Sequence, residues 1–264
     1  MKSKGLADRK PPVITVCKNC GHRVAGRFCP ECGQSADTDR LDLNFLIKHL
    51  RKVLFKYFDN GILYTSRELF TRPGHSIREY IEGKRVRHFE PLPLLVTIAA
   101  LYGILYNYFG IDFFYSVEND PASSMGIDFV SVNKWFSEHF ALASCILIPV
   151  YATGTRIAFR KQGYNFTEHL ALNTFSATQR LLFRLAAFPL LVVLNKTEHL
   201  KLLLDLLIIA DFLLFTWTLC QFFTRMKLAR SLMLAVASYV IFWVLYFALV
   251  VLLIFVLQAA FPKA

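Results

Sequence analysis

The chain has 264 residues, of which 55% are hydrophobic, and it carries a formal net charge of +11 at pH 7. Soluble domains rarely combine so hydrophobic a composition with so much charge, whereas membrane proteins with basic flanking segments commonly do. Composition therefore argues against a soluble domain and predicts an all-α integral membrane protein. Residues 1–16 contain charges and Pro11-Pro12 but no apolar run of a cleavable signal peptide, so they are expected to form a flexible tail.

Two CxxC pairs follow over residues 17–34. A glycine comes directly after each pair and lets the backbone turn, so that its N–H groups can point at the sulfurs. Two such turns complete the tetrahedral sulfur site that Zn²⁺ accepts, and four protein ligands leave no open position, so the expected zinc is structural. The predicted ligands are Cys17, Cys20, Cys29 and Cys32.

Other interpretations of these cysteines stay open. Two disulfides would need an oxidising compartment, and a redox CxxC usually lies on a βαβ unit, for which the sequence shows no pattern. His22 can replace one ligand, although with four cysteines present we expect it at the surface. A ribbon this small buries too little apolar area to fold alone, so metal binding should supply its folding free energy.

Residues 35–90 are predicted to form basic amphipathic helices next to the membrane. Apolar residues recur at helical spacing over residues 43–57. Two further short helices are expected over about 62–70 and 76–82, separated by Pro73-Gly74.

These helices have two interpretations. They can lie on the inner leaflet, where each basic residue contributes about 1 kcal/mol of attraction to anionic lipid, or they can form a small helical domain whose apolar stripe packs on itself or on the ribbon. A nucleic-acid partner is not expected, because the basic residues stand where membrane flanks need them. The residues predicted to contact headgroups are Arg72, Lys84, Arg85 and Arg87.

Residues 91–264 are predicted to form a bundle of about five transmembrane helices, each needing ~20 largely apolar residues. The expected spans are Leu92–Phe109, Phe140–Phe159, Ala171–Leu194, Leu200–Phe223 and Leu232–Leu257. Basic connections alternate with acidic or neutral ones, so the N-terminus is expected in the cytoplasm and the C-terminus outside. The reducing cytosol agrees with a thiolate metal site.

Polar residues in the third and fourth spans form a candidate membrane site. Asn173, Arg180 and Arg184 fall on one helical face, and the next span carries Asp205 and Asp211. Arg184 and Asp211 are each ~15 Å from the hairpin that joins the spans, so they are expected to pair. Ionisable groups at this depth are functional candidates, but they can also snorkel or fix helix register.

The segment before the third span contains Thr167, which is expected to cap that helix, and Glu168, which suits its first turn. Glu168-His169 and Glu138-His139 are alternative metal pairs. We favour the cap, because adjacent residues point in different directions on a helix.

Several motifs occur in order along the chain. They are Cys17–His22, Phe28–Gln34, Phe58–Gly61 with Thr65, Arg72–Gly74, Tyr80–Arg85, Pro91-Leu92 and Tyr164–Leu170. From Cys17 to about Leu172 the sequence resembles a bacterial membrane family of unknown function with an N-terminal zinc ribbon, domain-of-unknown-function family 3667. The resemblance implies a bacterial inner-membrane protein without a known activity, so it transfers no catalytic residue. It also implies a fixed turn at Arg72–Gly74 and a basic clamp at Gly83–Arg85.

The leading functional hypothesis is a non-enzymatic membrane protein whose ribbon and basic helices dock a protein partner or anionic headgroups. The alternative is a transporter or channel-like protein that uses the five intramembrane polar residues, which requires a water-filled cavity rather than a dry bundle. A membrane enzyme is the third hypothesis, although the sequence shows no nucleophile–base pair, Gly-rich phosphate loop or second metal cluster.

Overall fold

The computed structural model describes residues 15–36, 38, 60–111, 134–135 and 138–260. The predicted tail before residue 15 and the helix predicted over 43–57 lie outside these residues. The described part is mainly helical, as the composition predicts. Its only described sheet is a small antiparallel pair in the ribbon, β1 (Thr15–Val16) and β2 (Arg23–Val24).

Two short helices come before the apolar ones, as the sequence predicts. They are α2 (Asn60–Thr71) and α3 (Pro73–Glu82). α3 begins at Pro73, three residues earlier than expected, because proline lacks only an N–H that the first helical turn leaves unused. It ends at Gly83, whose φ of 114° lies in the left-handed region that favours glycine.

Four helices are long and apolar enough to cross a membrane: α4 (Pro91–Tyr108), α7 (Phe140–Ala158), α10 (His199–Phe222) and α11 (Leu228–Ala260). A fifth candidate span consists of α8 (Phe166–Ala186) and α9 (Phe188–Leu194), which meet at an angle of 48°. Pro189 stands in the first turn of α9, where its ring prevents continuation of the preceding helix. The prediction of about five spans is confirmed by length and composition, and the third span is broken.

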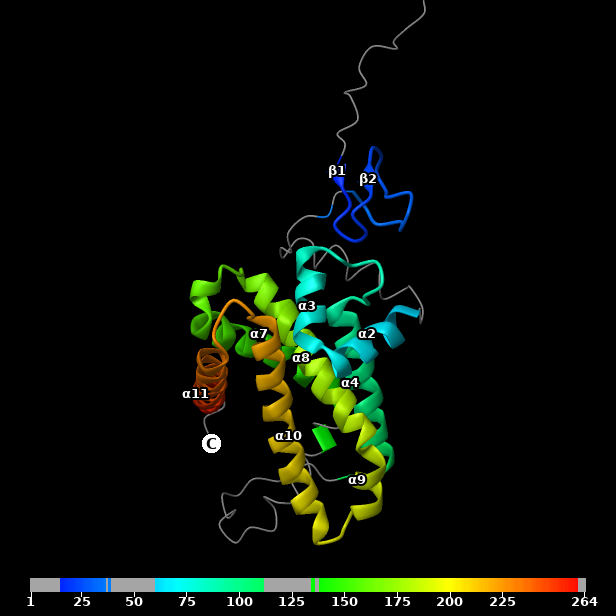
Figure 1. The fold of residues 1–264 in the computed structure, drawn as a ribbon. Helices are drawn as coiled ribbons and strands as arrows, with labels where there is room; N and C mark the ends of the chain where they lie inside the picture. The colour runs from blue at the N-terminus through cyan, green and yellow to red at the C-terminus, as the bar shows by residue number, and fades with distance from the viewer. Residues whose placement is uncertain (1–14, 37, 39–59, 112–133, 136–137, 261–264) are drawn as a thin grey trace, which may run out of the picture.

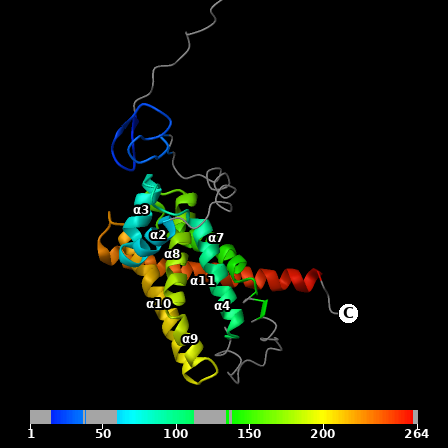
Figure 2. The same ribbon diagram turned by 90° about the vertical axis from the view of Figure 1, so that its right-hand side faces the viewer.

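α4, α8 and α10 run side by side, with the ribbon beyond α3 at one end and α9 at the opposite end (Figure 1, Figure 2). α11 is seen nearly end-on in Figure 1 and along its length in Figure 2, so it lies across α10. It packs antiparallel on α7, where the Tyr151 ring stacks on Phe242 with centroids 3.6 Å apart. A Cβ on Gly154 would lie only 2.9 Å from the Ser238 carbonyl oxygen, so the two helices are in close contact there.

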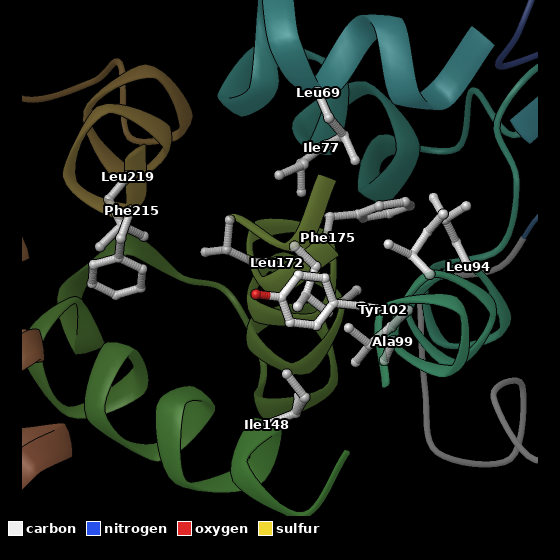
Figure 3. Packing of buried hydrophobic residues seen from close by; sticks show 14 of the residues in the cluster. Leu69, Ile77, Leu94, Ala99, Tyr102, Ile148, Leu172, Phe175, Phe215 and Leu219 are labelled. Atoms are coloured by element: carbon white, nitrogen blue, oxygen red, sulfur yellow. The ribbon is translucent and has the colours of Figure 1, made fainter. Parts of the chain in front are cut away.

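α8 forms the centre of the apolar core. Figure 3 shows Leu172 and Phe175 of α8 surrounded by side chains from α2, α3, α4, α7 and α10. The Tyr80 and Phe175 rings meet edge to face, with centroids 5.1 Å apart. Since neighbouring helices cover α8, it can carry polar residues that lipid would not tolerate.

The turn at Arg72–Gly74 joins α3 to the end of α10. The Gly74 N–H donates to Gln221 Oε1 at 3.2 Å, and a Cβ on Gly74 would lie 2.4 Å from the Phe222 backbone nitrogen. Arg78 donates to the Phe222 carbonyl at 2.9 Å, so it satisfies a carbonyl at the end of α10. The turn predicted at this motif is therefore an interhelical joint.

Candidate metal centre and intramembrane polar site

The four predicted cysteine ligands converge on one point. Their sulfur atoms all lie within 4.8 Å of one another. Cys17 Sγ is 3.6 Å from Cys32 Sγ, and Cys20 Sγ is 3.5 Å from Cys29 Sγ. A disulfide needs ~2.05 Å, so all four thiols are free and the two-disulfide interpretation is wrong. Four convergent thiols can hold a metal ion.

The two CxxC turns share one backbone pattern. The N–H of the first cysteine donates to the carbonyl five residues on, and the glycine N–H donates back to the cysteine carbonyl. These bonds are Cys17–His22 at 2.8 Å, Gly21–Cys17 at 2.9 Å, Cys29–Gln34 at 2.7 Å and Gly33–Cys29 at 2.9 Å. Gly21 and Gly33 have φ of 78° and 72°, as the predicted turns require. The Gln34 backbone N–H donates to Cys32 and lowers the pKa of that thiol to about 7.

The ribbon has almost no apolar core of its own. Besides the cysteines, only Val24 and Ala36 belong to its buried cluster. His22 is exposed and lies outside the group of convergent ligands, as expected. So few buried carbon atoms cannot hold the chain folded, which agrees with a fold that depends on a metal.

Gln34 anchors the ribbon to the end of α3. Its side-chain Nε2 donates to the Gly83 carbonyl at 2.8 Å, and its Oε1 accepts from the Arg85 N–H at 3.2 Å. Lys18 of the first turn donates to the Thr38 carbonyl and packs over Gly83, where a Cβ would lie 2.8 Å from Lys18 Cδ. The motif expected to be a basic clamp therefore uses its backbone to hold the ribbon.

The basic residues predicted to contact headgroups largely have partners within the protein. Arg72 pairs with Glu68 at 2.6 Å and with Glu79 at 3.3 Å, and Lys84 pairs with Glu79 at 3.4 Å. Burial alone would raise the pKa of Glu79, but the Arg72 guanidinium outweighs it and lowers that pKa. The Arg85 guanidinium lies over the Tyr80 ring, 5.6 Å from its centroid. A headgroup role for these residues, and for exposed Arg87, stays a prediction.

His88 follows these basic residues and is partly buried. Its Nε2 is 2.9 Å from Ser76 Oγ, and its ring meets the Tyr64 and Tyr80 rings. Burial lowers the pKa of His88 to about 4. The segment therefore gains no charge from this imidazole near neutral pH.

Asn165 caps α8, and the predicted cap at Thr167 is wrong. Asn165 Oδ1 accepts from the Glu168 N–H at 2.8 Å, and Glu168 Oε2 accepts from the Asn165 N–H at 2.7 Å. This capping box begins the helix at Phe166, before Thr167. Glu168 lies in the first turn, as predicted.

A buried polar cluster connects α8 to α7. His169 Nδ1 is 3.0 Å from Thr155 Oγ1, and the Asn173 side-chain amide donates to the same oxygen at 2.8 Å. His169 thus faces α7 while Glu168 faces the cap, so the two do not form the alternative metal pair. Thr155 is a residue that the sequence interpretation missed. The sequence does offer a sign of its role: Thr155 stands four residues after Tyr151 in an apolar run, and this spacing puts both residues on one face of α7.

The predicted ion pair between α8 and α10 is present. Arg184 Nη2 and Nε donate to Asp211 Oδ2 at 2.6 and 3.0 Å. Arg180 is buried one turn earlier, where it donates to Tyr151 Oη at 3.2 Å. Asp205, predicted to join this group, lies instead on the exposed face of α10.

Residues 59–103 match the family model described as protein of unknown function (DUF3667). The resemblance to this family is confirmed over that segment. The matched residues include the Arg72–Gly74 joint and the Gly83–Arg85 anchor, where α3 holds α10 and the ribbon. No curated protein matches the chain, and no solved structure does.

We expect Arg184→Ala to destabilise the helical domain by about 3 kcal/mol, because it leaves Asp211 buried without its partner. The double change with Asp211→Ala should cost less than the single one, since no unpaired charge remains. Unfolding in mixed detergent micelles measures both effects. Asp205→Ala is the control on the exposed face of α10 and should shift stability by no more than about 0.5 kcal/mol. Additive effects of the two changes would show that the residues do not interact.

Proposed function

We propose that this multi-pass membrane protein uses its ribbon as a zinc-stabilised cytosolic docking module for a protein partner. The supporting observation is the ribbon's surface: Phe28 is 66% exposed and Val16 is 65% exposed, although a metal site already occupies the ribbon's interior. Large exposed apolar side chains on so small a unit favour a contact surface. Arg23 and Arg27 are exposed as well, so the expected partner has acidic groups around an apolar patch.

The proposed metal is Zn²⁺. Tetrahedral zinc with Zn–S bonds of ~2.3 Å places its sulfur ligands about 3.8 Å apart. The Cys17–Cys32 and Cys20–Cys29 separations of 3.6 and 3.5 Å are close to that value. Four thiolates leave no position for substrate, so the zinc would hold the ribbon's shape and perform no chemistry.

A protein partner is favoured over a lipid surface by the position of the ribbon. The ribbon lies beyond α3, at the end of the molecule and away from the long apolar helices (Figure 1, Figure 2). α3 has 10 residues and is therefore ~15 Å long, which separates the ribbon from the level where the apolar helices begin.

We further propose that the ribbon end is cytosolic and that the membrane is the bacterial inner membrane, with the C-terminus outside as expected for five spans. The connections at the ribbon end carry Arg160, Lys161, Arg225 and Lys227. The connection between α9 and α10, at the opposite end, is short and nearly neutral. This asymmetry supports a cytosolic ribbon by the positive-inside rule.

The transporter alternative needs its five polar residues on one water-filled path. In the described part of the chain, Arg180, Arg184 and Asp211 line one small cavity, in which Arg184 pairs with Asp211, but Asp205 faces outward. Asn173 belongs to the separate cluster with Thr155. These positions do not favour a continuous path, so docking remains the better-supported function.

A photo-cross-linking residue in place of Phe28 tests the docking proposal in cells. We expect one discrete protein adduct, which is lost when Arg23 and Arg27 are both changed to Glu. The same probe in place of Val193, which is 74% exposed on α9, is the control and should give lipid adducts. Lipid adducts at position 28, or a protein adduct that survives the charge reversal, would contradict the proposal.

A further inference from the structure

A cavity of about 170 Å³ lies where α7, α8 and α10 meet. Its charged lining consists of Arg180, Arg184 and Asp211, and the rest is mainly apolar, including Phe140, Leu147 and Leu181. The side chains of Arg184 and Asp211 are 22% and 16% exposed, so the cavity reaches the surface between the helices.

The cavity contains one more positive than negative charge. Asp211 neutralises Arg184, but the described residues place no carboxylate within ion-pair distance of Arg180. Arg180 is 8% exposed and donates to only two oxygens in the described part of the chain, Ser176 O at 3.3 Å and Tyr151 Oη at 3.2 Å. A guanidinium has five N–H donors, so most of its donor capacity is unused.

Aromatic rings cover part of the Arg180 guanidinium without neutralising it. The guanidinium carbon lies 4.8 Å from the Tyr151 ring centroid and 5.6 Å from that of Phe215. These contacts fix the orientation of the guanidinium and stabilise its charge in part, but they supply no second carboxylate. Two arginines share one carboxylate in this cavity, so an anion bound there would be stabilising.

A hydrogen-bond acceptor in the cavity limits which anions can bind there. The carboxylate of Asp211 lines the same cavity as Arg180 and Arg184. It would repel a fully ionised group but would accept a hydrogen bond from an anion that keeps one O–H. A singly protonated phosphate monoester offers both that O–H and oxygens that match the planar donors of arginine.

We propose that the cavity between α7, α8 and α10 binds a phosphate monoester group, with Arg180 as its main ligand. The cavity is smaller than the ~300–1,000 Å³ of pockets that enclose drug-sized ligands, so it would hold the charged group alone. Its apolar rim suits an acyl chain attached to that group. Inorganic phosphate offers the same oxygens and the same O–H. The bound group can therefore belong to a lipid or be free phosphate, and experiment distinguishes these two sources.

Native mass spectrometry of the purified protein tests the lipid source, with phosphatidic acid and phosphatidylcholine of identical chains as probes. The shift of the thermal unfolding midpoint on addition of inorganic phosphate tests whether free phosphate binds. We expect phosphatidic acid to bind at least about tenfold more tightly than phosphatidylcholine, because charge-assisted hydrogen bonds to arginine favour the phosphate monoester. Stabilisation by inorganic phosphate with the same variant dependence would assign the site to the free anion.

Arg180→Gln should weaken the binding of whichever probe binds by about tenfold or more. Ser144→Phe fills the cavity from α7 while it keeps both arginines, and it should weaken binding similarly, so it decides the question if Arg180→Gln does not fold. Lys201→Gln, an exposed cation on α10, is the control and should bind as the wild type does. The proposal is overturned if neither probe binds the wild type, or if both cavity variants bind as it does.

Discussion

Gly74→Ala should destabilise the protein by about 3 kcal/mol or more, because the added methyl group has no space at the joint between α3 and α10. Its Cβ would lie 2.4 Å from both the Gln221 Cβ and the Phe222 backbone nitrogen. These are main-chain or near-main-chain atoms, so a rotamer change cannot relieve the overlap and the helices must separate. The midpoint of thermal unfolding in detergent, followed by tryptophan fluorescence, measures the loss.

Gly61→Ala is the matched control for this change. Gly61 lies in the first turn of α2, and the nearest atom to its added Cβ is at 3.5 Å, an ordinary contact. Alanine also favours a helix over glycine by up to ~1 kcal/mol, so this variant should be neutral or slightly more stable. Equal stability of the two variants would show that α3 does not approach α10 so closely.

Replacement of Cys29 and Cys32 by Ser should abolish metal binding and unfold the ribbon while the helical domain stays inserted. Structural zinc sites contribute about 10–16 kcal/mol of apparent binding free energy, far more than the contact of Val24 with Ala36 can replace. The helical core contains no ribbon residue among its described members, so it should survive. Elemental analysis of the purified protein, with thiol counting on the same sample, measures the effect.

Cys145→Ser is the control for the double cysteine change. Cys145 lies in α7 outside the sulfur cluster, so one zinc per chain should remain. Loss of membrane insertion in the double variant would show that the ribbon is part of the fold core. Absence of zinc from the wild-type protein would overturn the assignment of the metal.

The features that sequence predicted best are those with a local cause. Two CxxC spacings fix the sulfur cluster because each turn places two ligands by itself. Apolar runs of sufficient length identify the long helices, since a membrane span needs little information beyond length and composition. The Arg184–Asp211 pair could be predicted from sequence because a short hairpin fixes the relative depth of neighbouring helices.

The features that sequence missed depend on contacts between distant segments. Gln34 meets Gly83 49 residues later, and Gly74 meets Gln221 147 residues later. No local pattern specifies those partners. The cap of α8 was misplaced for a different reason: Asn165 and Thr167 are both competent caps, and the reciprocal bond of Glu168 selects Asn165.

The crossing of α11 and α10 has a consequence for the surrounding bilayer. α11 has 33 residues and is therefore ~50 Å long, whereas the hydrocarbon core is ~30 Å thick. Two crossed helices cannot both stand along the membrane normal, so at least one is strongly tilted. The close contact of Gly154 with Ser238 prevents α11 from swinging upright on its own. The tilt itself then absorbs the excess length of the helix, so the surrounding bilayer need not thicken to cover it.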